Sequence, residues 1–222
     1  MPKLHVEHVD QEETFYCGTA VAEMILKFYG VVEPGPVLGL QDQLWTEVCQ
    51  LTNGPVRSPN SVNCGGYMAT FERQQCYQCN RCACWYTTPQ ALEAVLSARL
   101  KKAVPMAVPV ATMRDGTFDP IPSTSGLLDR IDRAAAPVAA LVALGDHWVV
   151  LHGYQEADEE SQPGAVEIGG GRFVVGVYVN DPYKSEPETF VPIDEWLNTT
   201  WWTLVACGCA ADQDNRVAVT PG

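Results

Sequence analysis

Residues 16–30 read YCGTAVAEMILKFYG, and this stretch decides how the rest of the chain is interpreted. From residue 19 to residue 29 the apolar side chains recur at helical spacing, and Gly30 follows as a natural end. The pattern predicts an amphipathic helix with Cys17 in or just before its first turn. A thiol there faces unpaired N–H groups and the positive end of the helix dipole, which both favour the nucleophilic thiolate. Because a lone cysteine on a helix is more often a small buried apolar residue, its role depends on its partners.

Two other residues have the chemistry that a nucleophilic thiol needs. Gln11 lies upstream of Cys17, where its amide and a backbone N–H would stabilise the oxyanion that forms at an attacked carbonyl. His147 begins an apolar strand expected over residues 147–154, and histidine is the usual base that activates a thiol. Each has an ordinary alternative, since Gln11 fits a solvated loop and His147 fits a structural role. A metal shared with His152 is disfavoured, because the two histidines point to opposite faces of a regular strand.

A third partner is expected where residues 177–183 read VYVNDPY. An apolar strand ends there in Asn180 and Asp181, and a carboxylate or amide at this place can hold the imidazole in the required tautomer. The same three residues Asn-Asp-Pro also make a good turn. The residues alone therefore leave open whether Asp181, Asn180 or neither orients His147.

Composition limits the kinds of partner. The chain has 222 residues, a formal net charge of −13 and 46% hydrophobic residues, which suits one folded domain. Such an acidic chain lacks the electrostatic footprint of nucleic-acid binding or of binding to anionic lipid. The longest apolar stretch, residues 134–145, is too short for a membrane span, and no secretory signal is evident. We therefore expect a cytoplasmic protein, with leaderless export as the alternative.

The order of the predicted elements indicates an α+β fold in which helices precede an antiparallel sheet. Helices are expected at residues 19–29, 43–51, 89–100, 125–135 and 192–197, and strands at residues 138–144, 147–154, 172–179 and 202–207.

A cysteine-rich insertion is expected over residues 36–88, which hold six of the nine cysteines. The run CYQCNRCAC places four of them close together, at Cys76, Cys79, Cys82 and Cys84. Disulfides or a mixed thiol staple, a structural zinc ion and an iron–sulfur group are the candidates for this cluster, and its spacing matches no standard metal motif. No cofactor is expected for catalysis.

Taken together, these motifs resemble the papain-like cysteine peptidases, and among them the branch that cuts bacteriocin leader peptides after double glycines, with its stand-alone relatives. The resemblance covers residues 11–30, 89–100 and 137–206. It implies a single papain-like domain over residues 1–222 in which Cys17 is the nucleophile, His147 the base, Asp181 the orienting residue and Gln11 the oxyanion-hole donor. Asn180 is the alternative orienting residue, because papain itself uses an amide.

The resemblance implies a cysteine peptidase that acts on a peptide or protein substrate through a thioester intermediate. Transfer of the acyl group to an amine, and a host protein as the substrate of a papain-type effector, stay open. The alternative from another class is a non-catalytic papain-like module that binds a peptide or a metal through its cysteine-rich insertion. The chain contains neither a membrane span nor a GxxxxGK[ST] motif, so leader removal coupled to transport is not expected.

Overall fold

The computed structural model describes residues 3–13, 16–31, 39–53, 87, 89–101, 103–108, 121–142, 147–158, 162–200 and 216–221. The helices within these ranges are α1 (Cys17–Phe28), α2 (Leu40–Asn53), α4 (Pro89–Leu100), α5 (Ile121–Ala134) and α6 (Ile193–Glu195), which continues into the π-helical turn η3 (Trp196–Thr200). The strands are β1 (Ala103–Val108), β2 (Val138–Val142), β3 (His147–Glu156), β4 (Val166–Glu167), β5 (Phe173–Asn180), β6 (Thr189–Pro192) and β7 (Arg216–Pro221).

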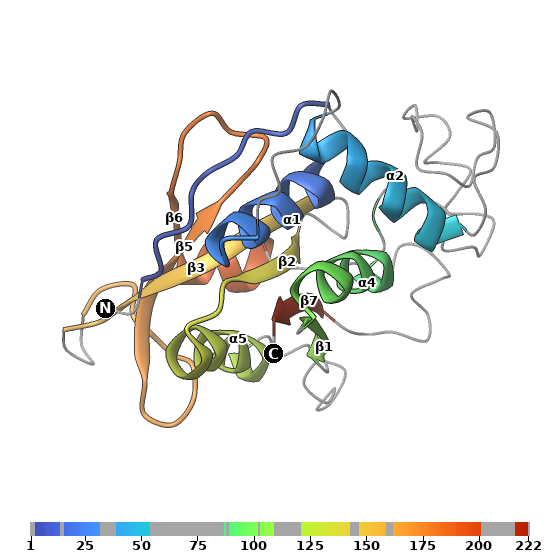
Figure 1. Ribbon diagram of the computed structural model, residues 1–222. Helices are drawn as coiled ribbons and strands as arrows, with labels where there is room; N and C mark the ends of the chain where they lie inside the picture. The colour runs from blue at the N-terminus through green and yellow to red at the C-terminus, as the bar shows by residue number, and fades with distance from the viewer. Residues whose placement is uncertain are drawn as a thin grey trace, which may run out of the picture.

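The strands form one antiparallel sheet with the order β1-β7-β2-β3-β5-β4, and β6 also pairs with β5. Helices pack against both faces of this sheet. Figure 1 shows α1 lying over β3 and α5 at the lower end of the sheet. Consecutive residues of a strand point to opposite faces. Trp148 and Val150 therefore join the core under α1, α2 and α4, whereas Val149 and Leu151 join the core beside α5 and α6.

Helix α1 is the central helix of the first core and begins at Cys17. Its buried side chains include Val21, Met24 and Ile25, which pack against β3 and α4. The N-terminal segment runs along the outside of β3, where the Leu4 N–H donates to the carbonyl of His152. Cys17 therefore lies at the N-terminal end of a helix that packs against the sheet.

The expected α+β class is confirmed, and most predicted elements are present with shifted bounds. The helix expected at residues 43–51 is α2, and the one expected at residues 125–135 begins earlier, at Ile121. Strands β1, β4, β6 and β7 were not predicted. The strand expected at residues 202–207, and the cysteines Cys76, Cys79, Cys82 and Cys84, lie outside the described residues.

None of the helices in the described part of the chain combines the length and the apolar character that a membrane crossing requires.

Candidate active site

The start of β3 and the end of β5 bring a histidine and a carboxylate together. These strands are antiparallel neighbours, with Val150 in register with Asn180, so the residues at the two strand ends face each other. The ring Nε2 of His147 lies 2.7 Å from Oδ1 of Asp181. Since the carboxylate can only accept, His147 donates from Nε2 and its Nδ1 is left for another partner.

The Cys17 thiol is that second partner of the ring. Burial of the His147 ring by itself lowers its pKa, but hydrogen bonds with Asp181 and Cys17 and the charges of both groups raise the pKa to about 9. For Asp181, burial raises the pKa, and the hydrogen bond to His147 and the charge of the ring bring it below 3.8. The contacts with Asp181 and Cys17 therefore favour the charged form of the imidazole.

Asn180 points away from this pair. Its Nδ2 donates to the carbonyl of Val6 over 2.9 Å, and its Oδ1 accepts the Glu188 N–H over 3.0 Å. The residue is only 1% exposed, so both bonds are buried. Of the two residues that the sequence left open, Asp181 is the one in contact with His147.

Gln11 is tied to the same strand end through its backbone. Its N–H donates to the carbonyl of Pro182 over 2.9 Å, which places it beside the residue that follows Asp181. Its side-chain Nε2 donates to the carbonyl of Glu13 over 2.9 Å. An amide NH₂ has two hydrogens, and among the described residues only the carbonyl of Glu13 accepts from this one.

Gly18, the residue after the thiol, packs directly against Thr87. A Cβ at residue 18 would lie 2.6 Å from Cγ2 of Thr87, closer than real side chains approach. The carbonyl of Thr87 in turn accepts the indole N–H of Trp148 over 3.0 Å. Thr87 thus contacts both Gly18, which follows Cys17, and Trp148, which follows His147. The sequence around residue 87 contains no motif that would predict these contacts.

Substitution Gly18→Ala is expected to destabilise the protein by about 1–3 kcal/mol, because the methyl group forces Thr87 to move. It should also lower the reactivity of Cys17, since Thr87 holds Trp148 next to His147. Chemical denaturation and the rate of Cys17 alkylation would measure the two effects. The control is Gly126→Ala in α5, where nothing lies within 4 Å of the added methyl group. A Gly18→Ala protein as stable as the Gly126→Ala protein would contradict the packing argument.

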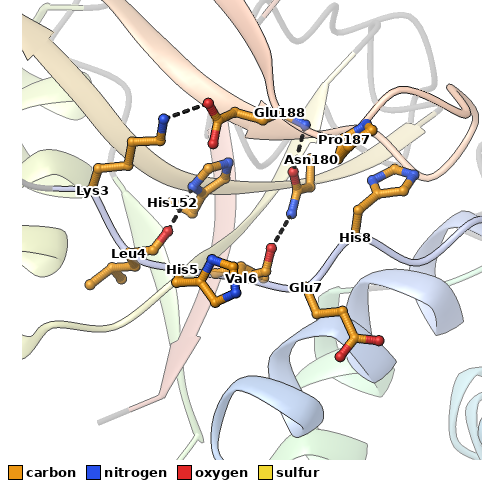
Figure 2. Close-up of a pocket in the computed structure, with 10 residues that line it drawn as sticks. All are labelled: Lys3, Leu4, His5, Val6, Glu7, His8, His152, Asn180, Pro187 and Glu188. Carbon is orange, nitrogen blue, oxygen red and sulfur yellow. Dashed lines mark hydrogen bonds and ion pairs between the residues drawn. The ribbon is translucent and has the colours of Figure 1, made fainter.

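A cavity of about 530 Å³ lies elsewhere, between the N-terminal segment and the sheet (Figure 2). His152 lines it and uses Nδ1 to donate to the carbonyl of Leu4 over 3.1 Å. Burial lowers the pKa of His152, which favours the neutral ring. The two histidines of β3 therefore have different partners, and within the described ranges no three side chains of the metal-ligating types come together.

Comparison with known proteins gives one family. The model of the Peptidase_C39 like family matches residues 3–204. Four solved chains are also similar, among them a double glycine motif protease from an AMS/PCAT transporter, in complex with the leader peptide. That chain is 15% identical with a TM-score of 0.44, and the alignment covers 99% of this chain and 94% of that one. A protein described as a C39-like peptidase from Bacillus anthracis is 15% identical with a TM-score of 0.48, and coverage is 98% and 94%. No curated protein matches the sequence.

Proposed function

Because this chain belongs to the Peptidase_C39 like family and is a cysteine peptidase, we propose that it cleaves peptide bonds with Cys17, His147 and Asp181. The single observation that supports this most is the hydrogen-bonded order of the three side chains, with the ring between the thiol and the carboxylate. Gln11 is the proposed oxyanion donor. The family match also favours a peptidase over the non-catalytic binding module that the sequence left open.

The proposed chemistry starts from a thiolate and an imidazolium. The Cys17 sulfur attacks the scissile carbonyl, and the negative charge on its oxygen is met by an N–H of Gln11 and a backbone N–H. The imidazolium of His147 gives its proton to the leaving amine as the C–N bond breaks and a thioester forms. Water then attacks the thioester while His147 takes its proton, and the C–S bond breaks to release the acid and restore the thiolate–imidazolium pair.

Asp181 has an orienting role in this scheme. By accepting from Nε2 it leaves Nδ1 facing the sulfur, and its charge stabilises the imidazolium. The Tyr183 N–H donates to the same carboxylate oxygen over 3.0 Å and holds it in place. The resemblance to leader peptidases suggests a peptide with two glycines before the cut, and hence a Gly-Gly peptide carrying 7-amino-4-methylcoumarin as a first probe.

Alkylation with limiting iodoacetamide tests the thiol–imidazole pair without a substrate. At pH 6, where an ordinary thiol with a pKa of about 8.5 is almost wholly protonated, we expect Cys17 to be modified far faster than a free cysteine peptide. His147→Ala should reduce the rate about 10²-fold or more, because the charged partner is lost. Mass spectrometry of the modified peptides gives the rate at each cysteine.

The matched control is His152→Ala, which removes the other buried histidine of β3 and leaves the contacts of Cys17 in place. It should alkylate at the wild-type rate. If Cys17 reacts no faster than the cysteine peptide, or if both histidine variants react alike, the proposed pair is wrong.

A further inference from the structure

The amide of Gln41 holds the loop that carries Gln11. Gln41 lies in the first turn of α2 and is 1% exposed. Its Oε1 accepts the N–H of Glu12 over 3.0 Å, and its Nε2 donates to the carbonyl of Asp10 over 2.8 Å. One side chain therefore binds the backbone on both sides of Gln11, in the way that a neighbouring strand would.

The loop is also fixed from the opposite side. The N–H of Gln11 donates to the carbonyl of Pro182, next to the proposed orienting carboxylate. Gln11 is thus held between the end of β5 and the start of α2, with its Nε2 anchored on Glu13. Its position relative to Cys17 depends on both anchors.

A second contact connects the same turn of α2 to the thiol. Asp42, the residue after Gln41, accepts the phenolic O–H of Tyr16 over 2.8 Å, and Tyr16 directly precedes Cys17. The first turn of α2 therefore contacts the chain beside the oxyanion donor and beside the nucleophile. An oxyanion donor works only within about 2.7–3.1 Å of the developing charge, so small shifts between these two segments matter.

We propose that Gln41 is a positioning residue that places Gln11 for stabilisation of the oxyanion. This inference rests on the proposed function and adds to it a residue that touches no substrate. It also gives the start of the stretch predicted as an insertion a role at the active site. Gln41 acts only through the backbone of residues 10–12. Its loss should therefore lower kcat and leave KM and the alkylation of Cys17 unchanged.

The test compares Gln41→Met, which keeps the size but loses both bonds, with Thr46→Ala on an exposed part of α2. With the Gly-Gly coumarin probe we expect Gln41→Met to lower kcat about 10–10²-fold with little change in KM. The reason is that a displacement of the Gln11 amide by about 1 Å is enough to reduce the rate by up to about 10²-fold. Iodoacetamide alkylation of Cys17 should stay at the wild-type rate, since this displacement at carbon forms no oxyanion. Thr46→Ala should be unchanged in both assays.

A double-mutant cycle separates positioning from general damage. Gln11→Ala alone should lower kcat about 10²–10³-fold, and adding Gln41→Met should change it little further, because the two act on one donor. Equal effects of Gln41→Met in both backgrounds, or an unchanged kcat in the single variant, would overturn the proposal. A loss of Cys17 alkylation in Gln41→Met, parallel to the loss of kcat, would overturn it as well.

A third variant covers the case in which Gln41→Met does not fold. Gln41→Glu keeps the acceptor for Glu12, but only its protonated form can donate to the carbonyl of Asp10. Its kcat relative to wild type should therefore rise as the pH falls, and a pH-independent ratio would overturn the proposal. If the wild-type protein neither cleaves the probe nor shows alkylation that depends on His147, the proposed function itself fails. If alkylation is normal and the Gln41 variants have the wild-type kcat, only the positioning role is refuted.

Discussion

Replacing Cys17 by alanine or serine is expected to abolish measurable turnover, with a loss of at least about 10⁴-fold in kcat/KM. The physical reason is that alanine has no nucleophile, and a serine hydroxyl is a much weaker acid and a poorer nucleophile than a thiol. Cleavage of the Gly-Gly coumarin probe, and of labelled casein as a less selective substrate, would measure the loss.

The fold should survive these substitutions. Cys17 is 5% exposed and contacts the core under α1, but serine differs from it by a single atom and alanine leaves only a small space. Thermal unfolding of both variants should therefore stay near the wild type. Cys79→Ala is the control for cysteine loss in general and should retain full turnover. Turnover that persists in Cys17→Ala would exclude the thiol mechanism.

The ends of predicted elements carry most of what the sequence reveals about the site. Cys17 precedes a strongly periodic helix and His147 begins an apolar strand, so local patterns locate both. Gln11 has no such pattern, and it was identified only through its spacing from Cys17. Each of these three residues also has an ordinary structural interpretation, and their predicted roles rest on the resemblance to the papain-like peptidases.

The choice between Asn180 and Asp181 depends on register, which a single strand does not specify. The pairing of β3 with β5 shifts between Leu151 and Gly153, and this irregularity affects which residue of β5 lies opposite each residue of β3. The sequence could not predict the contacts of Gln41 and Thr87 either. A single glutamine in a helix, or a threonine just before a helix, forms no recognisable sequence pattern.

One of the four missed strands, β1, shows a related limit of the sequence pattern. Strand β1 reads AVPMAV, and a proline inside a run argues against a strand. The observed order places β1 at the edge of the sheet, where a missing N–H is tolerated. Edge position is a property of the whole sheet, so the sequence of β1 alone could not reveal it.

Asp181→Asn is expected to lower kcat/KM about 10²–10⁴-fold, because an amide no longer stabilises the imidazolium or fixes its tautomer. Its signature is the pH profile. The hydrogen bond and charge of Asp181 both raise the pKa of His147 toward its value of about 9, so their loss moves that pKa down. The alkaline limb of Cys17 alkylation should therefore shift to lower pH in this variant.

The contact between His147 and Asp181 should also stabilise the fold within a defined pH range. The raised pKa of His147 stabilises the fold fully below its ordinary value of 6.5, and that contribution disappears as the pH rises through about 9. The lowered pKa of Asp181 stabilises the fold above its ordinary value of 3.8. Denaturation of the wild type and Asp181→Asn should hence differ most between these two ordinary values, and the part of the difference due to the charged ring should disappear above pH 9.

Asn180→Ala should lower the stability of the fold and leave the pH profile of Cys17 alkylation unchanged, unlike Asp181→Asn. It leaves the Val6 carbonyl and the Glu188 N–H without their buried partner, which costs about 1–3 kcal/mol of stability. In the folded protein the pH profile of alkylation should match the wild type, because the contact between His147 and Asp181 is intact. A shifted profile in Asn180→Ala, with an unshifted one in Asp181→Asn, would assign the orienting role to the amide instead, as in papain.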